Sequence, residues 1–148
     1  MALNMSGEYV LPLARKDVWK ALNDPEILKR SIPGCESLEK LSDTEFAAVV
    51  RLEVGPVKAR FKGRVKLENL VPPESYKIVG EGEGGVAGFA KGNSAVMLSD
   101  APEGTKLVYT AEATVGGKIA QLGQRLLAGT AKKTADRFFA NFAKALAV

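Results

Sequence analysis

Alternating apolar and polar residues mark the middle of the chain. From residue 35 to residue 115 the hydrophobic period is two, which is typical of strands with one buried face. Clusters of Gly, Pro and Asp interrupt the alternation at regular intervals and indicate turns. The strands that we expect in this region lie at about 46–52, 57–67, 75–83, 90–98 and 107–115. The pattern predicts an antiparallel meander.

Helical periodicity flanks this meander on both sides. A strand at 6–11 comes first, and short helices follow from about Lys16 and over 25–31. After Gly117, apolar residues recur at helical spacing to the end of the chain, which corresponds to ~45 Å of helix at 1.5 Å per residue. A half-buried sheet and one long amphipathic helix form complementary layers. We therefore expect a single α+β domain over residues 1–148, with the sheet of about seven strands wrapped on the C-terminal helix.

Composition excludes much enzyme chemistry. The 148 residues include no histidine and one cysteine, so Ser-His and Cys-His nucleophilic pairs and His-ligated metals are excluded. We expect no catalytic residues and no metal site. Cys35 has no partner for an intramolecular disulfide and is expected to be a small buried hydrophobe in a reducing compartment. The N-terminus lacks the pattern of an export signal, and no apolar run reaches the roughly 18 residues of a membrane span. A cytoplasmic location is the prediction.

Basic residues concentrate on one predicted strand. The chain carries 21 Lys and Arg against 17 Asp and Glu, a net charge of +4. Five of these cations share the polar face of the strand at 57–67: Lys58, Arg60, Lys62, Arg64 and Lys66. This stripe could dock an anionic membrane or an acidic protein. The alternative is a solvated face balanced by glutamates of neighbouring strands, with Glu81 and Glu83 pointing outward to pair with it. No nucleic-acid-binding signature is present.

A glycine-rich segment follows the fourth expected strand. Residues 80–92 hold six glycines, but they lack the phosphate-loop motif and do not open a helix. Glycines within strand patterns more often mark bends or the close approach of a backbone or ligand. We expect a bent hairpin with Phe89 at its tip or entrance, where it contacts a ligand or a membrane, or else packs in the core.

The first part of the long helix also suggests space for a ligand. Gly123 and Gly129 lie in this segment, and an interior glycine costs a helix about 1 kcal/mol relative to alanine. Room for a ligand or a helix bend would explain them. We expect an apolar cavity between Ile119, Leu122 and Leu126 and the inner sheet face, suited to a hydrophobic small molecule. The residues expected to contact this ligand are Phe61, Phe89, Leu122, Leu126, Tyr76 and Tyr109.

Several sequence blocks resemble one known family. The blocks are 7–12 (GEYVLP), 18–26 (VWKALNDPE), 32–36 (IPGCE), 54–63 (VGPVKARFKG), 87–92 (AGFAKG) and 115–123 (VGGKIAQLG). In this order they resemble the carbon monoxide dehydrogenase CoxG family, which belongs to the START/Bet v 1-like helix-grip (SRPBCC) superfamily. The resemblance spans nearly the whole chain. It implies a helix-grip fold: a strand, two short helices, six further strands, and a long helix across the sheet.

The same resemblance implies a function and partners. Members of this bacterial family are accessory proteins, not catalysts, of molybdenum-containing carbon monoxide dehydrogenases and related hydroxylases. They are implicated in bringing the enzyme to the membrane and in carrying a quinone- or lipid-like ligand, with no covalently bound cofactor. Many members continue after the long helix with a linker and a hydrophobic tail. This chain stops at Val148, so we expect any membrane contact, at the inner membrane face, to be peripheral.

Two other functional classes remain open. Some helix-grip proteins are polyketide cyclases or dehydratases, which need ionisable groups inside the cavity. In this sequence Tyr76 and Tyr109 are the only evident inward polar groups. Alternatively, apolar residues on the outer face of the sheet could join two copies in a homodimer or larger scaffold. The residues with this outward parity are Val49, Val79, Met97 and Val108.

Overall fold

A computed structural model describes residues 1–146, so residues 147 and 148 of the predicted domain lie outside the described part. The described elements comprise seven strands, three α-helices and two short 3₁₀ helices. In chain order they are β1 (Ala2–Leu11), α1 (Arg15–Leu22), α2 (Pro25–Ser31), β2 (Cys35–Lys40), β3 (Glu45–Val54), β4 (Val57–Val71), β5 (Ser75–Glu83), η1 (Gly85–Ala87), β6 (Phe89–Ala101), β7 (Gly104–Gly116), η2 (Lys118–Leu122) and α3 (Gln124–Leu146).

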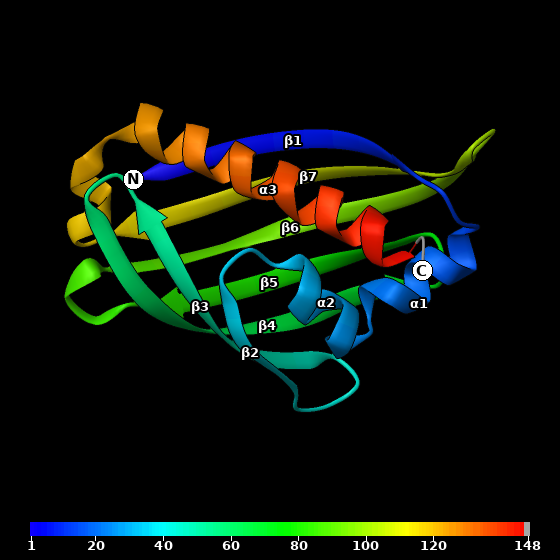
Figure 1. Cartoon of the computed structure of the whole chain (residues 1–148), viewed down its shortest axis with the longest axis horizontal. Coiled ribbons are helices and arrows are strands. Elements are labelled where there is room, and N and C mark those ends of the chain that lie inside the picture. Colours follow the sequence, from blue (N-terminus) through cyan, green and yellow to red (C-terminus); the bar gives the residue numbers. More distant parts are fainter. Residues whose placement is uncertain (147–148) are drawn as a thin grey trace.

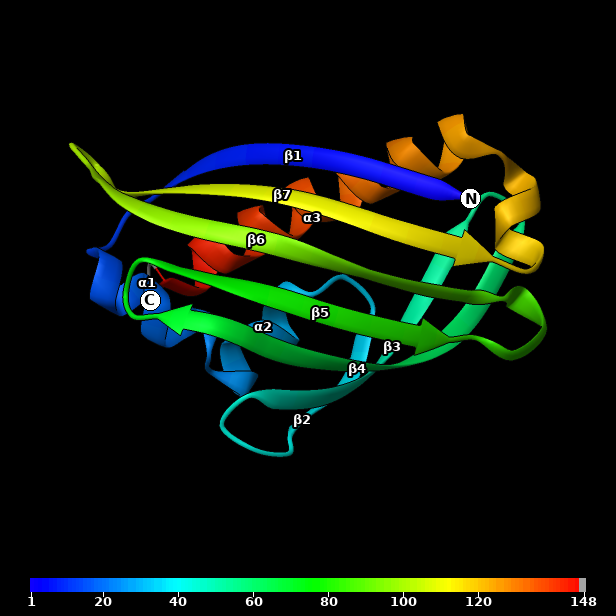
Figure 2. The ribbon, with the colours of Figure 1, turned by 180° about the vertical axis from the view of Figure 1, so that it is seen from behind.

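The strands form one antiparallel sheet in the order β1-β7-β6-β5-β4-β3-β2. Consecutive hairpins join β2 to β7, and β1 closes the order by pairing with β7. The curved sheet carries α3 across its inner face, while α1 and α2 cover one end (Figure 1). From behind, the outer face of the sheet is open (Figure 2). The predicted meander and the α+β helix-grip arrangement are confirmed.

The C-terminal segment differs from the single helix that its periodicity predicts. Gly123 has a φ of +94° and separates η2 from α3. Residues other than glycine rarely adopt this left-handed backbone, so the helical path must break there. The amide of Leu127 then donates to the carbonyl of Gly123 at 3.1 Å, and α3 begins in a new direction. The apolar spacing alone did not report this break, because it continues through both helices.

The core consists of two clusters at opposite ends of the sheet. One, which we call the helical end, joins α1, α2 and the C-terminal half of α3 to the sheet around Phe142, Leu107 and Val18. The other, the glycine end, joins η1, η2 and the first turn of α3 to the sheet around Phe61, Ile119 and other small or aliphatic residues. The two ends lie on opposite sides of Figure 1. The space between them is where a cavity can form.

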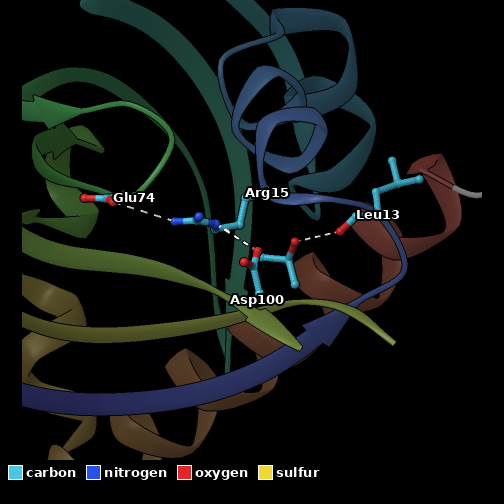
Figure 3. Close-up of polar contacts among 5 residues, drawn as sticks. Leu13, Arg15, Glu74 and Asp100 are labelled. Carbon is cyan, nitrogen blue, oxygen red and sulfur yellow. Dashed lines mark hydrogen bonds and ion pairs between the residues drawn. The ribbon is translucent and has the colours of Figure 1, made fainter. Parts of the chain in front are cut away.

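Polar contacts at the helical end fix the corner between β1 and α1 (Figure 3). The Arg15 guanidinium donates to Asp100 of the β6–β7 hairpin at 2.9 Å and lies 3.8 Å from Glu74 before β5. The Thr105 hydroxyl, which is fully buried, donates to the carbonyl of Leu13 at 2.6 Å. These contacts connect three chain segments that are distant in sequence. They hold the helical end closed.

An aromatic stack joins α3 to the edge strand β1. The Tyr9 ring lies between Phe139, with centroids 4.2 Å apart, and Tyr109, at 6.2 Å. The Tyr9 hydroxyl donates to the Asp136 carboxylate of α3 at 2.5 Å. Burial, and then the bond to this carboxylate, raise the pKa of Tyr9. The stack and its hydrogen bond anchor the second half of α3 to the sheet.

Candidate functional site

The inner face of the sheet contains a hollow of about 380 Å³. We call it the inner hollow. Its lining comes from β4, β5, β6 and β7, in the middle of the sheet. Residues with inward parity in this lining are Val65, Ile78, Gly80, Ala90, Gly92, Ser94 and Ala113. Two of these, Val65 and Ile78, also pack against the helical-end cluster, and Ala90 packs against the glycine-end cluster. The inner hollow therefore lies between the two parts of the core.

Strand register explains why the inner hollow forms. Gly80 of β5 stands opposite Val65 on one side and Gly92 on the other, and Gly92 stands opposite Ala113. Three adjacent strands thus present no side chain larger than a methyl group in one row. A Cβ added to Gly80 would meet the nearest Val65 methyl at 3.5 Å, an ordinary contact. The floor has free space above it.

Gly92 is required for a different reason. A Cβ on this residue would come within 2.2 Å of the carbonyl oxygen of Glu112. No side chain can be fitted there without shifting the backbone of β7. Gly92 therefore serves the close approach of two strands, whereas Gly80 leaves space. The two glycines lie in the same row and contribute to the hollow by different physical means.

The side chains of α3 are also small in the middle of the helix. Leu127 near its start and Phe142 near its end are buried in the two core clusters. Between them, the partly buried positions hold Thr130, Ala131 and Thr134. Large side chains thus anchor both ends of the helix, and small ones lie between the anchors. This arrangement keeps the space over the centre of the sheet open.

The chemistry of the inner hollow is apolar. The Ser94 hydroxyl donates to the carbonyl of Thr110 at 2.9 Å, so its proton is already used. The charged residues that touch the hollow, among them Glu81 and Lys91, alternate with the inward residues and direct their side chains to the outer face. Within residues 1–146, no group of three His, Cys, Asp or Glu is placed to hold a metal ion. This lining can bind a molecule by apolar contact.

Three of the ligand-contact residues expected from the sequence are core residues. Phe61 is buried at the glycine end, where its ring packs over Gly84. Tyr76 is buried at the helical end, edge-on to Trp19 with centroids 5.2 Å apart, and burial raises the pKa of Tyr76. Tyr109 belongs to the aromatic stack, and burial raises its pKa as well. All three face inward, but none lines the inner hollow.

The other three lie around the glycine end. Phe89 begins β6 with its ring over Gly116 and is partly exposed toward the outer face. Leu122 is partly buried in η2, and Leu126 is 40% exposed. The space expected beneath Ile119 is filled by the glycine-end cluster. The structure does not bring these six residues together, and their role in ligand contact stays a prediction. The sequence signal for the inner hollow was the row of small inward residues.

The basic stripe on β4 is matched by carboxylates. Four of its cations stand directly opposite a glutamate on β3 or β5, and Arg60 forms an ion pair with Glu36 at 2.6 Å. The cross-strand pairs are Lys58 with Glu53, Lys62 with Glu83, Arg64 with Glu81, and Lys66 with Glu45. The predicted outward pairing of Glu81 and Glu83 is confirmed. Docking of a membrane or partner on this stripe stays a prediction, on a face whose charges are balanced.

The outer face of the sheet has larger but shallower hollows. Two of them measure about 650 and 790 Å³ and are lined by the alternating charges of β3 to β7. Such walls favour water over an apolar ligand. Met97, which is 62% exposed, stands opposite Val108 on this face. The contact between two copies that these residues suggest stays a prediction.

Cys35 lies on the edge strand β2 and is only partly buried. The sequence predicted a buried residue, but an edge strand leaves one side of its backbone and side chains accessible. The thiol donates to the carbonyl of Ser37 at 3.3 Å. Burial raises the pKa of Cys35, and the nearby Lys29 offsets part of that rise.

The glycine end exposes apolar side chains. Val86 in η1 is 92% exposed, and Leu126 at the start of α3 packs near Gly55 of the β3–β4 turn while remaining accessible. These residues come from hairpins and helix starts that gather at one end of the molecule (Figures 1 and 2). Their side chains are therefore available for contact with another molecule. Of the helices in residues 1–146, none is long and apolar enough to cross a membrane.

Comparison with known proteins places this geometry in context. The profile of one family, described as a carbon monoxide dehydrogenase subunit (CoxG), matches residues 7–147. A conserved protein from Geobacillus kaustophilus is 36% identical with a TM-score of 0.91, covering 98% of this chain and 95% of that one. No curated protein matches the sequence.

More distant structures share the fold alone. The aromatase/cyclase Zhui from Streptomyces sp. R1128 is 12% identical with a TM-score of 0.70, covering 99% of this chain and 94% of that one. Ara h 8.0201 is 16% identical with a TM-score of 0.66, and the match covers 100% of both chains. Proteins with different names thus share this sheet and its long helix, so function must be argued from the site.

Proposed function

The chain belongs to the carbon monoxide dehydrogenase CoxG family, and on this premise we propose that it is an accessory protein that carries a hydrophobic molecule in the inner hollow. The observation that supports this proposal is the row of Gly80, Gly92 and Ala113 between two core clusters. A protein that needed only stability would fill this row, because unfilled apolar space costs stability. A ligand would complete the core.

The ligand class that fits is a quinone- or lipid-like molecule. A volume of about 380 Å³ lies near the lower end of the range for small-molecule sites. A floor of glycine and alanine offers a flat surface to a ring, and Val65 and Ile78 offer aliphatic contacts beside it. The energy of binding would come from apolar area removed from water, at about 25 cal/mol per Å².

The glycine end is the side at which this ligand would enter. Its exposed apolar residues, Val86 and Leu126, can contact the surface of a membrane without crossing it. The partner implied by the family is a carbon monoxide dehydrogenase-type molybdenum hydroxylase. In this proposal the protein brings that enzyme and a membrane-derived hydrophobic molecule together.

Filling the inner hollow tests this function. Gly80→Leu adds a side chain where a Cβ has free space, and Gly82→Leu adds the same side chain two residues along the same strand, outside the lining of the inner hollow. Binding of decylubiquinone is measured by displacement of the fluorescent probe anilinonaphthalene sulfonate. We expect about a tenfold weaker affinity for Gly80→Leu, a loss of about 1.4 kcal/mol. The Gly82→Leu control should bind like the original protein.

Two results would contradict the carrier function. One is an unmodified protein that binds neither the probe nor decylubiquinone. The other is an equal loss of affinity in Gly80→Leu and Gly82→Leu while both variants keep the original circular dichroism spectrum. The first result removes the ligand, and the second removes the inner hollow as its site.

A cyclase- or dehydratase-like activity is the alternative suggested by the fold. Such chemistry needs an ionisable group next to the substrate. Tyr76 and Tyr109 are packed in the helical-end cluster, and Ser94 is hydrogen-bonded to the backbone. The inner hollow offers contact rather than proton transfer, which supports a carrier over an enzyme.

A further inference from the structure

The excess positive charge of the chain lies on one helix. Helix α3 contains five cations and one carboxylate, so its net charge of +4 equals that of the whole chain. The other 125 residues balance, with 16 Lys and Arg (21 − 5) against 16 Asp and Glu (17 − 1). The cations of α3 are Arg125, Lys132, Lys133, Arg137 and Lys144. All five are exposed.

The single carboxylate of α3 is already engaged. Asp136 accepts a hydrogen bond from Tyr9 at 2.5 Å and lies 3.9 Å from the Lys132 ammonium. The remaining cations of the helix form no ion pair with another residue of 1–146. Arg125, Lys133, Arg137 and Lys144 also recur at spacings near multiples of a turn, which places them along one face.

The neighbouring helix α2 extends this surface. The side-chain amide of Asn141 donates to the carbonyl of Ser31, the last residue of α2, at 3.1 Å. The last turn of α2 holds Lys29 and Arg30, and both are exposed. The exposed sides of α2 and α3 therefore form a continuous basic surface. We call it the α3 face.

The α3 face contrasts with the basic stripe on β4. Each stripe cation has a glutamate opposite or bonded to it, so that face presents little net charge to a partner. The α3 face has no comparable set of carboxylates among the described residues. Complementary charge steers association and selects partners. The stronger basic surface is thus the one that sequence alternation does not reveal.

We propose that the α3 face docks an acidic surface of a partner protein. A phospholipid surface is the less favoured partner, because a helix that lies on a membrane directs large apolar residues toward it. The apolar side of α3 is instead turned into the core through Leu127 and Phe142. On its exposed side, the residues between the cations are small, namely Ala128, Gly129 and Ala140. Small residues allow another protein to approach the helix closely. This docking does not depend on a ligand in the inner hollow.

A pair of charge-matched variants tests the site. One replaces Lys132, Lys133 and Arg137 with Gln, and the other replaces Lys58, Lys62 and Lys66 of β4 with Gln, so each removes three positive charges. The probe is a short fluorescein-labelled poly-L-glutamate, measured by anisotropy at low ionic strength. We expect about a tenfold loss of affinity for the α3 variant and less than twofold for the β4 variant. Equal losses would overturn the proposal, because total charge would then explain the binding.

Cross-linking of the unmodified protein gives a second result that needs no variant. A carbodiimide joins lysine amines to carboxylates that lie against them, and mass spectrometry then identifies the lysines joined to poly-L-glutamate. We expect Lys132 and Lys133 to react more than Lys58 and Lys62, although both pairs are exposed. Predominant coupling on β4 would overturn the site. Vesicles containing phosphatidylglycerol are tested in parallel, and binding to them through α3 with none to poly-L-glutamate would overturn the choice of an acidic protein.

Discussion

The two ends of the sheet are built differently. The helical end is filled by large side chains, stacked aromatic rings and buried polar contacts, so each group there has several partners. The glycine end has short 3₁₀ helices, an almost fully exposed Val86, and a series of glycines in its turns and helix starts: Gly55, Gly84, Gly85, Gly88, Gly116, Gly117 and Gly123. The difference teaches that one end supplies stability and the other leaves room for exchange of a ligand. The inner hollow lies where the first kind of packing gives way to the second.

Removing a large anchor from each end should have unequal effects. Phe142 is 0% exposed and stacks on Phe138, so Phe142→Ala should lower the free energy of unfolding by about 4 kcal/mol. Leu127 lies beside the more open region, where neighbours can relax, and Leu127→Ala should cost about 2 kcal/mol. Urea unfolding followed by circular dichroism measures both values. Equal losses would show that the ends are packed alike.

The two glycines of the inner row should also separate. Gly92→Ala forces a Cβ against the Glu112 carbonyl, and we expect it to destabilise the protein by about 2 kcal/mol. Gly80→Ala meets only ordinary contacts and should be neutral or stabilising by up to about 1 kcal/mol, because alanine loses less conformational entropy. Thermal unfolding of the two variants provides the measurement. A large destabilisation by Gly80→Ala would mean that the row has no free space.

Alkaline pH should weaken the helical end selectively. All three tyrosines lie in or against its core, and the pKa of Tyr76 is raised by burial. A raised folded-state pKa favours the neutral tyrosine, so its contribution to stability is complete below the ordinary pKa of about 10 and falls above it. The loss continues until the pH passes the folded-state pKa.

Replacing one tyrosine measures this contribution. Between pH 9.5 and 11.5, chosen to bracket the ordinary value of about 10, Tyr76→Phe should lose stability more slowly than the original protein, by up to about 1 kcal/mol per pH unit. Urea midpoints across this range are the readout. Parallel pH profiles for the two proteins would show that Tyr76 ionises equally in the folded and unfolded states.

Much of the fold follows from residue patterns. Period-two alternation located the strands, and proline and glycine clusters located their turns, because both depend on neighbours in sequence. The break at Gly123 was not predicted as a break, since a glycine's φ depends on how the helix must meet the sheet. The helix restarts there so that Leu127 can reach the glycine-end cluster.

The candidate site was only partly accessible from the sequence. The glycine-rich segment 80–92 pointed to a special region, but the alignment of Gly80, Gly92 and Ala113 depends on strand register across two hairpins. Aromatic residues such as Phe61 suggested ligand contact by their chemistry, whereas folding used them to fill the core. The α3 face needed knowledge of which cations remain without a carboxylate after pairing, which only three-dimensional structure supplies.

Amide chemical shifts in the presence of decylubiquinone test the central claim most directly. We expect titration to shift the resonances of Gly80, Gly92 and Ala113, together with those of the glycine end around Val86. Residues of the aromatic stack, such as Tyr9 and Phe139, should change little because that end stays packed. Shifts confined to the outer face, or concentrated in the helical end, would contradict a ligand site in the inner hollow.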